Sequence, residues 1–181
     1  MIVREVLNGV SMIAPLAAIV MRAPATKYGK MAVLGTALHA PVSCGYHLMC
    51  AAKLNPDPMN CVGRKLDQTF IHVAAAMMTY ATSHSIQYTA AAAAMNTRYI
   101  RLLWISGPHD TPKKRRLRVA LAYMVYLLPV FLNNVRMGAR ILVTLLLSSA
   151  AFILDKPLKG AGHTVFHLGL GASWYDLAKV I

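Results

Sequence analysis

Seven long apolar segments occupy most of this chain, and they limit its possible folds more than any other feature. With 57% hydrophobic residues and only six acidic residues, the composition excludes an ordinary soluble domain and is typical of an integral membrane protein. The sequence therefore predicts an all-α fold, a seven-transmembrane-helix bundle. The predicted spans are residues 6–21, 31–52, 66–83, 86–105, 119–133, 141–154 and 165–181.

Several of these segments are shorter than the roughly 20 residues that a helix needs to cross about 30 Å of hydrocarbon. Neighbouring residues are therefore expected to extend them. The stretch 66–105 is too long for one span, and its four consecutive polar residues at 82–85 predict a turn. The connections are short, so we expect a single domain over residues 1–181. The first segment has no leader-like cleavage site, and we expect it to be retained as a helix.

Lysine and arginine are unevenly divided between the two ends of the predicted bundle. One end carries Arg4, Lys53, Arg64, Lys65, Arg98, Arg101, Lys113, Lys114, Arg115, Arg116, Arg118, Lys156 and Lys159. The other end carries only Arg22, Lys27, Lys30, Arg136, Arg140 and Lys179. Because basic residues accumulate on the cytosolic or matrix side of a membrane, the first end is predicted to be the inner one, with the N-terminus on that side.

The densest basic run, residues 113–118, has no aromatic residues between its charges. It lies in a short connection between two apolar spans rather than on a basic domain surface. We therefore expect no nucleic-acid partner, and we expect this end of the bundle to contact anionic lipid headgroups.

Histidine and aspartate at membrane depth indicate a metal site. An ionisable group costs roughly 2.5 to 3.5 kcal/mol there, so it usually faces the bundle interior and has a function. Residues four apart share a helix face, which brings Ser43 close to His47 and His163 close to His167. Asp67 begins the third span at the same end of the bundle. The sequence therefore predicts a metal site formed among His47, His163, His167, Asp67 and Ser43.

Three neutral imidazoles and an open fourth position are typical of a catalytic zinc site, where the metal lowers the pKa of water to about 7. Asp67 is expected to accept a proton from that water, and Ser43 to hydrogen-bond the water or the developing oxyanion. His39, one turn before Ser43, is interpreted as an interior polar contact rather than a ligand. A site just below the membrane surface would meet the amide or ester bonds of lipids.

The order of these residues resembles the CREST superfamily of seven-helix membrane proteins. This superfamily includes the alkaline ceramidases, the progestin and adipoQ receptors, and hydrolases that remodel lipid-anchored proteins. The resemblance covers helices two to seven and rests on Ser-x-x-x-His at 43–47, Asp67 and His-x-x-x-His at 163–167. It implies that the three histidines bind zinc and that Asp67 and Ser43 contact the reacting water. It further implies a zinc-dependent, ceramidase-like lipid amidase or esterase.

Two other functions fit the same sequence. One is a non-catalytic accessory subunit of a large membrane complex, which the short loops and the net charge of +13 suit. The other is a haem anchor with His47 and His163 as axial ligands. We expect membrane lipids and other membrane-protein subunits as partners. Among cellular membranes, the mitochondrial inner membrane is favoured over the endoplasmic reticulum or Golgi.

Overall fold

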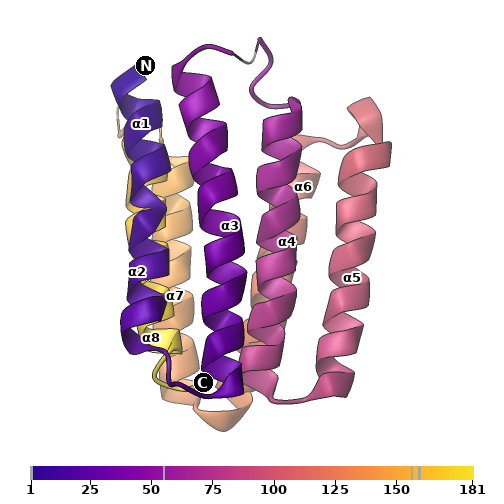
Figure 1. Cartoon of the computed structure of the whole chain (residues 1–181), viewed down its shortest axis with the longest axis vertical. Helices are drawn as coiled ribbons and strands as arrows, with labels where there is room; N and C mark the ends of the chain where they lie inside the picture. Colours follow the sequence, from indigo (N-terminus) through magenta and orange to yellow (C-terminus); the bar gives the residue numbers. More distant parts are fainter. Residues whose placement is uncertain (1, 55, 156, 159) are drawn as a thin grey trace.

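The computed structural model describes residues 2–54, 56–155, 157–158 and 160–181. Within them the secondary structure is helical, which confirms the all-α prediction. The elements are α1 (Ile2–Ser11), α2 (Ile13–Arg22), α3 (Lys27–Ala51), α4 (Val62–Ser83), α5 (Ile86–Ile105), the short 3-10 helix η1 (Gly107–His109), α6 (Pro112–Asn133), α7 (Val135–Ile153) and α8 (Gly162–Leu177). From α2 onward, each long helix runs roughly antiparallel to the one before it, and together they form an upright bundle (Figure 1).

Helices α1 and α2 form one continuous rod, so the described elements make seven rods (Figure 1). Met12, between them, keeps right-handed helical angles of φ −65° and ψ −14°. The interruption has a simple cause: Pro15 has no N–H to donate to the carbonyl of Ser11, so one helical hydrogen bond is missing. The number of rods matches the seven apolar segments of the sequence.

The helix boundaries depend on caps that hydropathy does not detect. The predicted turn at 82–85 is confirmed, since His84 adopts a left-handed φ of 55° and the Ser85 hydroxyl accepts from the Tyr88 N–H at 3.2 Å. The predicted start of α6 at residue 119 is too late. Thr111 caps this helix and Pro112 fits its first position, so α6 begins within the basic run.

Among the described residues, three helical stretches are long and apolar enough to cross a membrane: Ile2–Arg22, Pro112–Asn133 and Val135–Ile153. Helices α3 and α4 are of comparable or greater length, but they bury polar side chains such as His47 and Asp67 inside the bundle. These inward polar residues lower the hydropathy of both helices. The three apolar stretches are compatible with a membrane protein.

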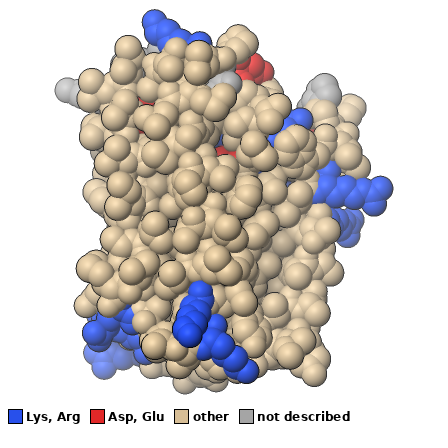
Figure 2. Space-filling model, in the orientation of Figure 1, with Lys and Arg blue, Asp and Glu red and all other residues tan. Residues whose placement is uncertain are grey.

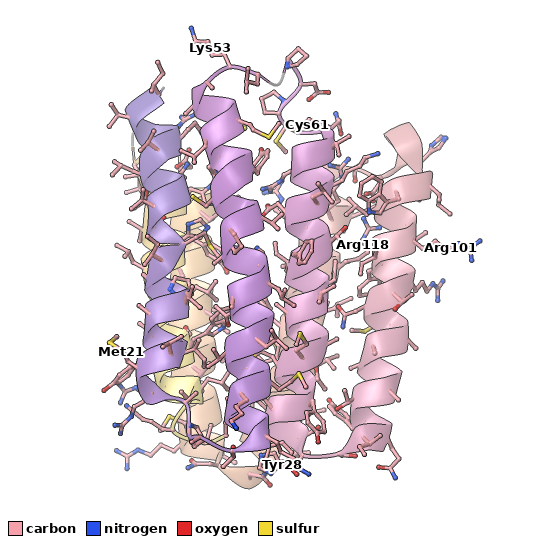
Figure 3. The ribbon with its side chains drawn as sticks, viewed as in Figure 1. Met21, Tyr28, Lys53, Cys61, Arg101 and Arg118 are labelled. Atoms are coloured by element: carbon pink, nitrogen blue, oxygen red, sulfur yellow. The ribbon has the colours of Figure 1, made fainter. Side chains whose placement is uncertain are left out.

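Basic side chains gather toward the two ends of the bundle. On the face drawn in Figure 2, blue Lys and Arg side chains lie at the top, along the upper right edge and across the lower end, and the centre of the face has none. Lys53 and Tyr28 lie near opposite ends of α3, and Arg101 points outward from α5 (Figure 3). Of the predicted basic residues, Lys156 and Lys159 lie outside the described residues.

Arg115 is buried, although from the sequence we expected the whole 113–118 run to contact lipid headgroups. It donates to the Asp110 carboxylate at 3.0 Å and to the carbonyl of Met59 at 2.8 Å. Arg118 also pairs with Asp110. These bonds hold the connection before α4 against the start of α6, so the two arginines have a structural role.

The apolar core fills the half of the bundle farther from the N-terminus. Ile19, Met78, Leu127 and Leu177 are fully buried near the ends of α2, α4, α6 and α8, four rods that run in the same direction. The opposite half contains His47, His167 and Asp67, which are also buried. The fold thus places much of its apolar core toward one end and the histidine cluster with Asp67 toward the other.

Gly162→Ala is expected to lower the free energy of unfolding by about 1 to 3 kcal/mol. An added Cβ would overlap the carbonyl oxygen of Ala151 where α7 and α8 meet. Thermal unfolding in detergent would measure the loss. Gly45→Ala is the matched control, since a Cβ there meets open space and alanine favours the helix. Equal destabilisation by both changes would contradict this packing argument.

Candidate metal centre

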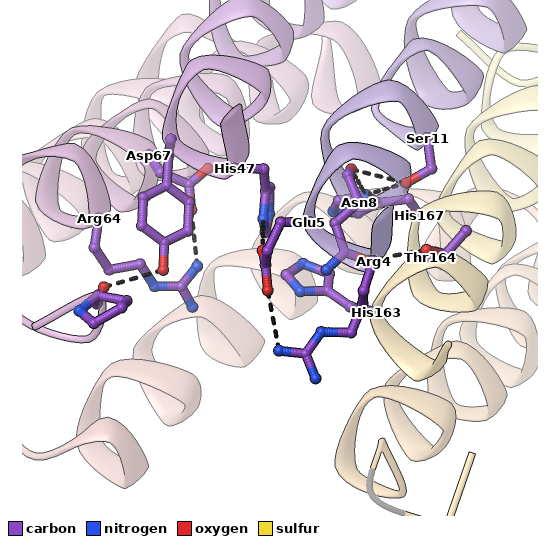
Figure 4. Close-up of polar contacts among 12 residues, drawn as sticks. Arg4, Glu5, Asn8, Ser11, His47, Arg64, Asp67, His163, Thr164 and His167 are labelled. Atoms are coloured by element: carbon purple, nitrogen blue, oxygen red, sulfur yellow. Dashed lines mark hydrogen bonds and ion pairs between the residues drawn. The ribbon is translucent and has the colours of Figure 1, made fainter. Parts of the chain in front are cut away.

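Three histidine side chains converge between α3 and α8 near the N-terminal end of the bundle (Figure 4). One ligand nitrogen from each of His47, His163 and His167 lies within 4.8 Å of the other two. Their rings make edge contacts, with centroids 4.6 Å apart for His47 and His163 and 4.7 Å apart for His163 and His167. His47 and His167 are buried and His163 is partly buried. The predicted cluster is therefore present and can hold a metal ion.

Helix α1 orients two of the three imidazoles through their Nδ1 atoms. The Nδ1 of His47 lies 2.9 Å from a carboxylate oxygen of Glu5. The Nδ1 of His167 lies 2.8 Å from the hydroxyl of Ser11 and 3.0 Å from the carbonyl of Asn8. With Nδ1 donating to these acceptors, Nε2 of each ring carries the free lone pair. The Nε2 of His47 is buried without a hydrogen-bond partner, which is the state expected of an atom placed to bind a metal.

Sequence reasoning missed the contribution of α1. Glu5, Asn8 and Ser11 recur every three residues in an otherwise apolar segment, which places them on one face of a helix. That polar stripe was a usable signal. Its meaning depends on knowing that α1 packs beside α3 and α8, which the sequence does not state.

Asp67 lies beside the histidine cluster and is 3% exposed. The Nη1 of Arg64 donates to its Oδ2 at 3.0 Å, and the Nε2 of His39 lies 3.3 Å from its Oδ1. Ser43 and Asp67 line the same cavity. His39 is thus an interior polar contact, as predicted, and it holds Asp67. Arg64 was expected at the membrane interface, but it turns inward because Asp67 is its partner one turn along α4.

A cavity of about 260 Å³ adjoins these residues. Its polar end is formed by Ser43, Asp67, His163 and His167, and most of its remaining lining is apolar. Where α6 and α7 border it, lining residues such as Ile153 are also exposed on the outer surface. The cavity therefore reaches the outside between these two helices. All the site residues predicted from the sequence except His47 line it, and the ring of His47 contacts that of His163.

The haem alternative does not fit this geometry. Axial ligands lie on opposite sides of a porphyrin plane, which has to pass between their rings. The rings of His47 and His163 instead contact each other edge to face, with centroids 4.6 Å apart. The convergence of a third histidine on the same point also suits a small ion rather than a flat macrocycle.

Glu5→Ala is expected to weaken the binding of an added metal ion, measured with zinc, by about 10- to 100-fold, because the carboxylate that orients His47 is lost. Competition with a chromophoric chelator would measure the change. Arg4→Ala is the control: Arg4 pairs with the other side of Glu5 and is largely exposed, so its loss leaves the bond to His47 in place. Zinc affinity that is unchanged in Glu5→Ala would show that α1 has no part in the centre.

Searches of protein-family models, curated proteins and solved structures found no match to this chain. The class of protein is thus defined by fold and site alone. It is an all-helical chain, compatible with a membrane protein, with a buried three-histidine centre beside a mainly apolar cavity.

Proposed function

We propose that this chain is an intramembrane zinc-dependent hydrolase that cleaves an amide or ester bond of a lipid. The observation that carries the proposal is the convergence of three histidine nitrogens within 4.8 Å at the polar end of a largely apolar cavity. Such a cavity suits an acyl chain, and its polar end suits the bond that links the chain to a headgroup. Asp67 and Ser43 lie at that same end.

Zinc fits the donor set, because three imidazoles leave a fourth position open, and when bound it supplies Lewis-acid activation of water and carbonyl. Asp67 accepts a proton from the attacking water as the water oxygen bonds to the carbonyl carbon. The carbon–nitrogen or carbon–oxygen bond then breaks, and the proton passes to the leaving amine or alcohol. Ser43 donates a hydrogen bond at the polar end of the cavity, where it can orient the water or stabilise the oxyanion.

The proposal includes a seven-span membrane bundle with the N-terminus on the inner side. Its support is the three apolar stretches, the basic residues near both ends and their excess at the N-terminal end. The five positions that resemble the CREST superfamily support membership of that class, because His47, His163, His167, Asp67 and Ser43 meet at one end of the bundle. We infer an organelle membrane, with the mitochondrial inner membrane favoured over the endoplasmic reticulum or Golgi.

The purified protein in lipid nanodiscs tests the function. Ceramide and glycerophospholipids would be supplied separately, and released fatty acid would be measured by mass spectrometry. We expect turnover that a chelator abolishes and added zinc restores. Absence of turnover in protein with a full complement of zinc would contradict the hydrolase. Co-purification with a large membrane complex, together with that result, would favour the accessory subunit instead.

A further inference from the structure

The cavity beside the histidines has an excess of positive charge. Among the described residues, its charged lining residues are Arg64, Arg116 and Asp67, so two arginines line it against one carboxylate before any metal ion is counted. A cavity for a neutral lipid has no need of the second arginine. Because charge in a low-dielectric environment is stabilised by opposite charge, the cavity is suited to an anionic ligand.

Arg64 lines the cavity and has a guanidinium donor without a partner among the described residues. Its Nη1 binds Asp67 and its guanidinium lies over the ring of Tyr46, 5.3 Å from the centroid. Its Nε is buried and has no hydrogen-bond partner. Leaving a buried donor unpaired is unfavourable, whereas a bond from a guanidinium to an anionic oxygen is among the stronger hydrogen bonds in proteins.

Gln68 lies one turn after Arg64 on the same face of α4 and is 7% exposed. It also lines the cavity, and its Oε1 is buried without a partner. Nothing bonded to Oε1 fixes the side-chain amide in this orientation. If the amide group rotates by a half-turn, its NH₂ group takes the position that Oε1 now holds. The group at that position is then a hydrogen-bond donor.

Arg116 is exposed on the first turns of α6, where the cavity reaches the outer surface. Its one intramolecular hydrogen bond is a long one, 3.4 Å from Nε to the carbonyl of Pro112. The other guanidinium nitrogens remain available to a ligand. Val119 follows Arg116 by one turn and Leu170 lies in the wall contributed by α8, so apolar surface continues inward from the charged mouth.

We propose that the lipid bound in this cavity is anionic, with a phosphate or carboxylate group held by Arg64 and Arg116 and an acyl chain along the apolar wall. This inference refines the substrate class and rests on the proposed function only in calling the lipid a substrate. Binding itself requires no turnover. It can therefore be tested separately from hydrolysis.

Three probes separate the contribution of the anionic group from that of the acyl chains. They are dioctanoyl phosphatidate, dioctanoylglycerol and glycerol 3-phosphate. Binding to the full-length protein in detergent would be measured by calorimetry, on wild type and on variants whose melting temperatures are unchanged. We expect phosphatidate to bind at least about tenfold more tightly than either other probe. Arg116→Gln is expected to weaken phosphatidate binding by about five- to tenfold, and Arg64→Lys, which keeps the charge but loses Nε, to weaken it as well.

Lys113→Gln is the matched control, because it removes one positive charge from the same end of α6 at a residue that does not line the cavity. We expect it to bind phosphatidate as wild type does. Equal affinity for dioctanoylglycerol and phosphatidate would overturn the anionic subsite. Equal affinity for glycerol 3-phosphate would indicate a free anion rather than a lipid. An equal loss of phosphatidate affinity in Lys113→Gln and Arg116→Gln would show that Arg116 acts through the general surface charge and not through binding in the cavity. Each of these results is obtained whether or not the protein hydrolyses lipid.

Discussion

His163→Ala is expected to reduce zinc affinity by more than about 100-fold. It removes one of three converging ligand nitrogens, a larger loss than the 10- to 100-fold that follows from removing an outer hydrogen-bond partner. Elemental analysis of the purified protein should change from about one zinc per chain to a small fraction. Competition with chelators would then measure the affinity that remains.

His84→Ala serves as the control for this experiment. His84 is exposed at the end of α4, in the part of the bundle away from the centre, where it stacks on Tyr28. Its loss should leave the zinc content unchanged. A zinc content that persists in His163→Ala, or one that falls equally in both variants, would mean that the three histidines do not form the metal site.

Asp67→Asn is expected to lower lipid turnover by about 10²- to 10⁴-fold while zinc remains bound. Asparagine keeps the size of the side chain but cannot accept the proton of the attacking water. It also loses the ion pair with Arg64, so thermal unfolding has to be measured alongside turnover. The informative result is lost turnover at full zinc content in protein that still unfolds cooperatively.

Asp176→Asn is the matched change in a buried aspartate that lies near the far end of α8. Asp176 pairs with Arg140 at 2.7 Å and with Lys179 at 2.6 Å, so its loss also breaks local ion pairs. Turnover in this variant should remain close to that of the wild type. Undiminished turnover in Asp67→Asn would remove Asp67 from the proposed reaction, whatever the metal does.

Much of the fold could be predicted because apolar length and turn chemistry are local properties. The seven segments and the break at 82–85 follow from residues close together in the chain. The start of α6 was misjudged because its first turns are basic. A count of apolar residues does not register a helix that Thr111 and Pro112 initiate from polar sequence.

The candidate ligands were also predictable, because histidines four residues apart share a helix face and the alternating direction of the helices brings His47 and His163 to one end. The supporting residues were not. Glu5, Asn8 and Ser11 orient the imidazoles only because α1 packs against α3 and α8, and hydropathy does not specify which helices become neighbours.

The sequence by itself thus determined the helical class, the number of rods and which histidines are candidate metal ligands. Each of these depends on periodicity and spacing along the chain. Only the tertiary structure decided that Arg64 turns inward to Asp67, that Arg115 is buried on Asp110, and that a charged cavity opens beside the centre. The physical reason is that a long charged side chain orients toward an oppositely charged group, and the position of that group depends on the tertiary structure. In this bundle, helix packing determines which charges at one end meet each other and which remain free to meet a ligand.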